Sequence, residues 1–213
     1  TGLMLLIAGV RLKFIIPPIV LALIALAISL WRDPMRTKRL LSWLNLEETK
    51  DGVGYQAYQA MIALGSGGWF GLGLGNGRQK LGFVPEHHTD FILSIIGEEL
   101  GLVATLGVVL GFVLIIICGV YIAIQARDTF GTMLAAGITF LIGLQAFINI
   151  GVVTSALPNK GLALPFISYG GSNLLAMLVC VGVLISVARR ARELEIKPAN
   201  PFATDELSSA PAT

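Results

Sequence analysis

Long apolar runs alternate with glycine-rich polar stretches along the chain. Four runs come close to or exceed the roughly 20 mostly apolar residues that a helix needs to cross a bilayer. They cover residues 14–31, 91–126, 129–157 and 173–189. The apolar start of residues 1–13 predicts the end of a truncated membrane helix followed by a cytoplasmic turn. The pattern therefore predicts an all-α polytopic membrane protein.

The polar segments between these runs differ in length and character. Residues 32–90 are far too many for a turn and predict a large extracytoplasmic loop. Within it, RDPMRTKRLLSWLN is typical of a helix lying in the membrane interface, and GYQAYQAMIALGSGGWFGLG predicts a short interfacial or re-entrant segment. A second extracytoplasmic loop is expected at 158–172, and the aperiodic residues 190–213 predict a disordered cytoplasmic tail.

Composition agrees with a membrane protein. The 213 residues are 55% hydrophobic and 13% charged, whereas soluble domains have about 25% charged residues. The net charge of +2 points to no particular partner, and nucleic acid is not expected as one. Cys118 and Cys180 lie inside predicted spans, where they are expected to pack as small apolar side chains.

Basic residues near span ends predict the orientation, because they favour the cytoplasmic side. Arg11, Lys13 and the RRAR run at 189–192 place their ends inside, and counting spans then places Arg127 inside as well. One cluster breaks the rule, since it falls in the outer loop: Arg32, Arg36, Lys38 and Arg39. Either the orientation is reversed, or this cluster binds something anionic outside.

Asp90 is the first candidate for chemistry. It directly precedes an apolar run, so one interpretation is a helix N-cap. The other is a general base at the mouth of a membrane cavity, where partial shielding from water makes a carboxylate more basic. Helical spacing places Ser94 and Gly97 on the face of Asp90, as a strip of small residues that leaves room for a substrate.

Glu98 and Glu99 interrupt the same apolar run, and ionisable groups in a span usually face the protein interior and mark function. At 1.5 Å per residue, Glu98 lies about 12 Å along a helix from Asp90. The carboxylates of a glycosidase pair are at most about 9.5 Å apart. Unless the helix is broken between them, the two glutamates are therefore expected to form hydrogen bonds between helices.

Other polar residues suggest an anion site more than a metal site. Adjacent His87 and His88 do not converge easily on one ion, so no metal ligand set is predicted, and His88 is expected in the wall of the site. The glycine run at 71–77 lacks the flanking strand and helix of a phosphate loop. Arg78 and Lys80, which follow it, are better candidates for binding an anion, as is Lys160 in the second loop.

Two long motifs resemble a known family. They are GLGLGNGRQKLGFVPEHHTDFILSIIGEELG at 71–101 and ALPNKGLALPFISYGGSN at 156–173. In this order they are similar to the signature of the SEDS family (shape, elongation, division and sporulation). The FtsW-like division branch matches better than the RodA elongation branch, which usually lacks a lysine at the position of Lys160. Departures at Gly77, His87 and Asn173 leave Asp90 unaffected.

The resemblance implies the C-terminal part of a ten-helix fold with a large extracytoplasmic loop. It implies a peptidoglycan glycosyltransferase that polymerises lipid II on the outer face of the cytoplasmic membrane, at the division septum. The implied partners are a class B penicillin-binding protein transpeptidase and other divisome proteins. The essential aspartate of the family corresponds to Asp90. The other implied site residues are Glu86, His88, Thr89, Lys160, Ser168, Tyr169 and Gly170.

In the expected reaction, Asp90 takes the proton of the acceptor hydroxyl as this attacks the anomeric carbon of the lipid-linked donor. Arg78, Lys80 and Lys160, or a divalent cation, offset the charge of the leaving pyrophosphate. No other cofactor is expected. A lipid II flippase, a non-catalytic divisome scaffold and a RodA-like elongation polymerase are the alternatives that the same residues leave open.

Overall fold

In the residues that a computed structural model describes, the regular structure consists of six helices. The structure describes Gly9, residues 11–45, Thr49, Gly52, residues 54–78 and residues 89–196, with the backbone alone for Arg36, Arg39 and 193–196. The helices are α2 (Leu12–Arg32), α3 (Pro34–Leu44), α4 (Tyr55–Ser66), α5 (Ile92–Gln125), α6 (Thr129–Val153) and α7 (Gly171–Ile196). Because no strand occurs in the described part, the predicted all-α class is confirmed.

Four of these helices are long and apolar enough to cross a membrane: Leu12–Arg32, Ile92–Gln125, Thr129–Val153 and Gly171–Arg192. One boundary differs from the prediction, because α7 continues to Ile196 while a disordered tail was expected from residue 190. The arginines, alanine and glutamates of this stretch all favour helix, so the helix does not stop where the apolar run ends. The rest of the predicted tail lies outside the described residues, as do residues 1–8.

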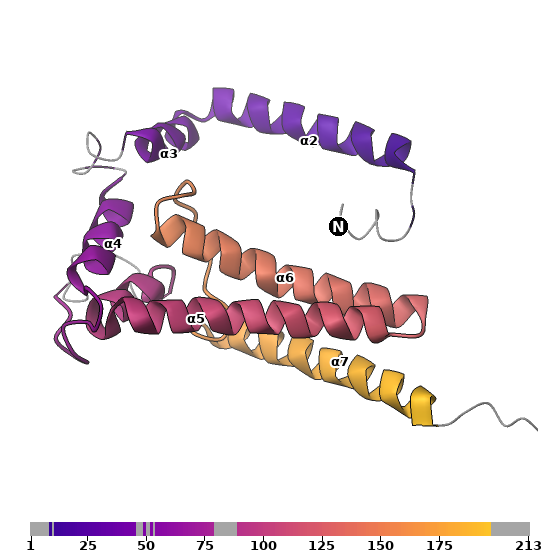
Figure 1. Cartoon of the computed structure of the whole chain (residues 1–213). Coiled ribbons are helices and arrows are strands. Elements are labelled where there is room, and N and C mark those ends of the chain that lie inside the picture. Colours follow the sequence, from indigo (N-terminus) through magenta and orange to yellow (C-terminus); the bar gives the residue numbers. More distant parts are fainter. Residues whose placement is uncertain are drawn as a thin grey trace, which may run out of the picture.

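The core lies between α5, α6 and α7, which run side by side in Figure 1. Fully buried side chains include Leu93 at the start of α5, Ile142 on α6 and Leu164 in the loop before α7. Many large apolar side chains on the outer faces stay exposed, such as Phe147 and Leu175. An apolar outer surface over a small core is what a bundle that lies in hydrocarbon requires.

α5 and α6 approach closely where small residues face each other. Gly119 on α5 is buried, and a methyl group added there would overlap with the Thr139 side chain on α6. Thr139 turns its own hydroxyl back to its helix, donating to the Ala135 carbonyl at 2.7 Å. Small residues at a helix crossing let the two backbones pack tightly, which drives association of membrane helices.

The α2–α3 segment lies apart from the bundle, above it in Figure 1. Ile15 alone among the α2 side chains is buried. Asp33 caps α3, accepting a hydrogen bond from the Met35 amide at 3.1 Å, and Trp43 Nε1 of α3 donates to the Ser155 carbonyl beyond α6 at 2.9 Å. The Trp43 hydrogen bond attaches the predicted interfacial helix to the residues just after α6.

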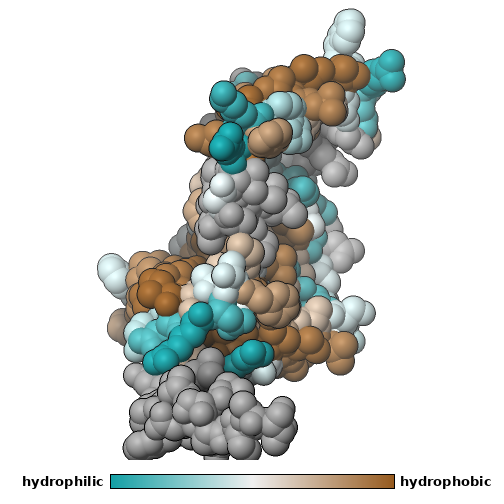
Figure 2. All heavy atoms as spheres, turned by 90° about the vertical axis from the view of Figure 1, so that its right-hand side faces the viewer, coloured by the Kyte–Doolittle hydropathy of each residue, from teal (hydrophilic) through white to brown (hydrophobic). Residues whose placement is uncertain are grey.

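Six described basic side chains at span ends gather at one end of the molecule, whereas Arg32, in the last turn of α2, lies at the other end of that helix. In Figure 1 the start of α2, the turn between α5 and α6, and the end of α7 all lie on the right. Viewed from that end, hydrophilic patches lie beside broad apolar surfaces (Figure 2). The exposed basic residues of these three segments are Arg11, Lys13, Arg127, Arg189, Arg190 and Arg192. By the positive-inside rule this end is the one expected on the cytoplasmic side.

Close packing at Gly119 gives a testable expectation for stability. Gly119→Ala should lower the free energy of unfolding by about 1–3 kcal/mol, because the added methyl group must push α5 and α6 apart. Gly107→Ala is the matched control on the same helix, since a methyl group there meets no atom within 4 Å. It should be neutral or slightly stabilising. Thermal unfolding in detergent measures both, and adding Thr139→Ala should restore part of the loss.

Candidate functional site

Asp90 lies at the end of the bundle opposite the basic end, just before α5. The N-cap position of α5 belongs to Phe91, whose side chain makes no capping hydrogen bond, so the cap interpretation does not describe Asp90. Phe91 itself is buried in the core. This apolar anchor holds the chain at the helix start, while Asp90 beside it is half-buried.

The expected strip of small residues next to Asp90 is not open to a substrate. Ser94 is fully buried, and its hydroxyl donates to the Phe91 carbonyl at 2.7 Å. Gly97 packs against α4, where a methyl group on it would overlap with the Leu64 side chain. α4 presents its own small residues, Ala57, Ala60 and Ala63, as its buried face. The prediction was wrong because this short helix fills the space beside α5.

The second predicted outer loop comes to Asp90 from the other side. A methyl group added at Gly161 would overlap with the Asp90 carboxylate, so the backbone of this loop lies directly against the acid. Lys160 is the preceding residue, and its side chain is exposed. The structure thus brings together two candidates that are 70 positions apart in sequence, a carboxylate and a loop that carries a cation.

Two polar side chains of α6, the buried Asn149 and the half-buried Gln145, hold this junction together. Asn149 of α6 donates its Nδ2 to the Asp90 carbonyl at 2.8 Å and to the Leu162 carbonyl at 2.6 Å. Gln145, one turn earlier, donates to the Ala163 carbonyl at 2.8 Å. Sequence interpretation missed both residues, although uncharged polar side chains four positions apart in an apolar span are a recognisable sign of contacts between segments.

The segment 168–170 has a buried residue next to an exposed one. Ser168 is 6% exposed. Its hydroxyl donates to the Thr89 carbonyl at 2.5 Å and accepts from the Leu164 amide at 2.6 Å, so it ties Thr89 to the second loop. Tyr169 is 84% exposed and is available to a ligand. The Gly170 carbonyl accepts a hydrogen bond from the Leu174 amide in the first turn of α7.

α5 is broken at Gly101, which has φ 78° and ψ −174°. The glycine-rich segment after α4 replaces the helical hydrogen bonds that are lost there. The Leu72 and Gly73 amides donate to the Glu98 and Glu99 carbonyls, both at 3.0 Å. On the other side of the break, the Leu102 and Val103 amides donate to the Gly68 and Trp69 carbonyls at 2.9 and 3.3 Å.

The two glutamates accept hydrogen bonds from this same glycine-rich segment, whereas hydrogen bonds between helices were expected. Glu98 is 2% exposed, and its Oε1 accepts from the Arg78 amide at 2.8 Å. Glu99 Oε2 accepts from the Gly75 amide at 3.1 Å. Arg78, a predicted anion ligand with an exposed side chain, is thereby fixed through its backbone to α5. The break lies beyond Glu98, so it does not bring Glu98 closer to Asp90.

Three of the predicted site residues, Lys80, Glu86 and His88, lie outside the described residues, and so does His87. Among the described residues, no group of three or more His, Cys, Asp or Glu side chains could hold a metal ion. The chemistry that the described part offers is one carboxylate beside a lysine-bearing loop, with Arg78 on a separate, anchored loop.

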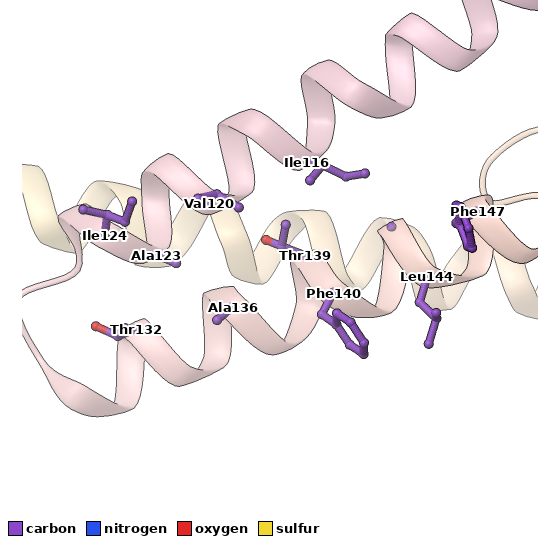
Figure 3. A pocket seen from close by; sticks show the side chains of 11 residues that line it. Ile116, Val120, Ala123, Ile124, Thr132, Ala136, Thr139, Phe140, Leu144 and Phe147 are labelled. Atoms are coloured by element: carbon purple, nitrogen blue, oxygen red, sulfur yellow. The ribbon is translucent and has the colours of Figure 1, made fainter. Parts of the chain in front are cut away.

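An apolar groove of about 530 Å³ opens between α5 and α6 at a different place. Figure 3 shows Ile116 and Val120 of α5 across the groove from Phe140 and Leu144 of α6. Its walls fit a hydrocarbon chain or an apolar helix. None of the described residues that line it is titratable, so the polar junction at Asp90 is the candidate site for proton transfer.

Comparisons with known proteins agree on one family. Residues 1–193 match the family model of cell cycle proteins that groups FtsW, RodA and SpoVE. Over 190 residues the chain is 48% identical to the probable peptidoglycan glycosyltransferase FtsW of Geobacter metallireducens, covering 89% of this chain and 51% of that protein. Over 159 residues it is 47% identical to stage V sporulation protein E of Bacillus subtilis, covering 75% and 43%.

A solved structure shares the fold. It is described as "Structural coordination of polymerization and crosslinking by a peptidoglycan synthase complex", and the match has a TM-score of 0.70 at 23% identity, covering 88% of this chain and 52% of that chain. The chain spans about half the length of the curated relatives it matches.

Two glycines of the loop at the α5 break allow the cost of backbone strain to be measured apart from the cost of steric overlap. Gly71 and Gly75 both have positive φ (77° and 85°), but only at Gly71 would a methyl group overlap with the α5 backbone, at the Glu99 carbonyl. Both alanine variants bear the cost of a left-handed conformation, about 1 kcal/mol. Gly71→Ala should lower the melting temperature clearly more than Gly75→Ala. Equal losses would show that this loop is not seated on α5.

Proposed function

The chain belongs to the FtsW/RodA/SpoVE family, the SEDS proteins that its motifs resemble, and we propose that it forms the C-terminal half of a peptidoglycan glycosyltransferase. This enzyme polymerises lipid II on the outer face of the cytoplasmic membrane at the division septum. The observation that carries the proposal is the Asp90 carboxylate lying against Gly161, next to Lys160, at the end of the bundle opposite the basic end. That is the outer end in the positive-inside orientation.

The transfer needs one base at this place. Asp90 accepts the proton of the GlcNAc 4-hydroxyl as its oxygen bonds to the anomeric carbon of the MurNAc donor. The bond from that carbon to the pyrophosphate oxygen breaks with its electron pair, and attack from the opposite face inverts the carbon. Because the pyrophosphate leaves as a stable anion, a second carboxylic acid to protonate it is unnecessary. Glu98, buried and bonded to the Arg78 amide, is not required to act as one.

Cationic side chains on the two loops stabilise the departing charge. Lys160 precedes Gly161, whose backbone lies against the base, and Arg78 is held to α5 through Glu98. Lys80 is two residues further along the same chain. Such preorganised cations lower the barrier because charge develops on the pyrophosphate in the transition state. A divalent cation carried on the phosphates is the alternative source of positive charge.

The proposed partners follow from the family. We expect a class B penicillin-binding protein, which crosslinks the strands, and other divisome proteins to act with the full-length enzyme. Division is favoured over elongation because the curated relatives at 45–48% identity over about 190 residues are FtsW proteins. A RodA-like role would instead appear as rescue of an elongation defect.

Replacing the proposed base tests the activity. In full-length protein reconstituted with its transpeptidase partner, Asp90→Asn should reduce lipid II polymerisation at least about 100-fold, since general bases contribute roughly 10²–10⁴. Asp33→Asn is the matched control, because Asn caps a helix as well as Asp does, and should retain the wild-type rate. Gel analysis of labelled glycan strands measures both.

Other functions predict other results. Wild-type polymerisation by Asp90→Asn would overturn the assignment of the base. Transfer of lipid II across vesicle membranes by the wild type, unchanged in Asp90→Asn and without strand formation, would indicate a flippase. A scaffold would retain partner binding in both variants and polymerise nothing in either.

The close approach at Gly161 makes a separate prediction. Gly161→Ala should lower the polymerisation rate about 10- to 100-fold while partner binding persists, because its methyl group displaces the base or the lysine loop and small misplacements are costly in catalysis. Gly171→Ala is the control in the same region, where a methyl group would meet no atom within 4 Å. It should act like wild type. A Gly161→Ala enzyme of normal rate would contradict contact between loop and base.

A further inference from the structure

α6 carries a buried amide that core packing does not explain. Asn149 is 1% exposed and lies in a membrane helix, where polar side chains are costly and usually functional. Its Oδ1 is buried and has no hydrogen-bond partner among the described residues. An apolar residue of the same size would avoid burying that unpaired acceptor, so the benefit of Asn149 must lie in its other atom.

That atom, Nδ2, joins the two halves of the candidate site. Its two hydrogens go to the carbonyl of Asp90 at 2.8 Å and to the carbonyl of Leu162 at 2.6 Å. Leu162 lies two residues beyond Lys160. One side chain on a rigid helix therefore holds the backbone of the proposed base and the backbone of the lysine loop at a set separation.

Gln145 extends the same arrangement by one turn. Its Nε2 donates to the Ala163 carbonyl at 2.8 Å and reaches Asn173 Oδ1 at 3.3 Å. Because residues four apart share a helix face, Gln145 and Asn149 both point toward the second outer loop. Neither touches the Asp90 carboxylate through any described hydrogen bond, so their effect on it would pass through the backbone.

We propose that Asn149 is a positioning residue for glycosyl transfer, which sets the distance between the Asp90 base and the Lys160 loop. The inference rests on the proposed function. Catalysis is sensitive to such a distance, since a displacement of about 1 Å can reduce a rate about 100-fold. Substrate binding depends less on it, because the donor is also held by its lipid chain and by other cations.

The test measures kcat and KM for lipid II polymerisation by the full-length protein with its transpeptidase partner. Asn149→Leu, of similar size but without donors, should lower kcat about 10- to 100-fold and leave KM within about twofold. Asn149→Asp is nearly isosteric and can donate at most one hydrogen bond, when protonated. Its kcat should lie between those of wild type and Asn149→Leu. It also serves if the leucine variant fails to fold.

Thr139→Val is the matched control on the same helix. Thr139 is also a buried polar side chain, but its hydroxyl donates within α6 to Ala135, so its loss should leave kcat within about twofold of wild type. Wild-type kcat in folded Asn149 variants, an equal loss in Thr139→Val, or a change confined to KM would each overturn the inference. Asp90→Asn is run in parallel. If it is inactive while the Asn149 variants are normal, the positioning role alone fails; if it is active, the proposed base fails.

Discussion

Backbone amides and carbonyls that leave a helix within a membrane protein must find partners in the protein, because hydrocarbon offers none. This constraint organises the outer end of the bundle. Where α5 breaks at Gly101, the glycine-rich segment after α4 supplies the missing donors and acceptors. Where the 158–170 loop passes over α6, side-chain amides from that helix take up its carbonyls. Both loops are thus held by hydrogen bonds to the helices, and the 158–170 loop also by Leu164, which is buried in the core.

The position of the candidate base follows from the same constraint. Asp90 is located by its backbone, through its carbonyl bonded to Asn149 and through the buried side chain of Phe91 next to it. Its carboxylate is left to face Gly161. Ser168 contributes in the same manner at Thr89.

The spans and the helical class could be predicted, because long apolar runs are local signals, whereas the association of Asp90 with the Lys160 loop is implied only by the family that the motifs resemble. The hydrogen-bond partners of Glu98 and Glu99 could not be predicted from the sequence. Each carboxylate binds a backbone amide at least 20 positions earlier, and backbone donors leave no trace in side-chain pattern. The strip at Ser94 and Gly97 seemed open because helical spacing shows which residues share a face, not that α4 covers it. Asn149 was missed since one amide within an apolar run barely alters hydropathy.

The glycine-rich segment after α4 and the Asn149 side chain also hold different parts of the site, and this bears on mechanism. The glycine segment fixes Arg78 to the short helical piece before the break, whereas Asn149 fixes the Lys160 loop to α6. The two candidate cations therefore belong to different supports, Arg78 to α5 and Lys160 to α6. A leaving pyrophosphate that contacts both would bridge α5 and α6 at their outer ends.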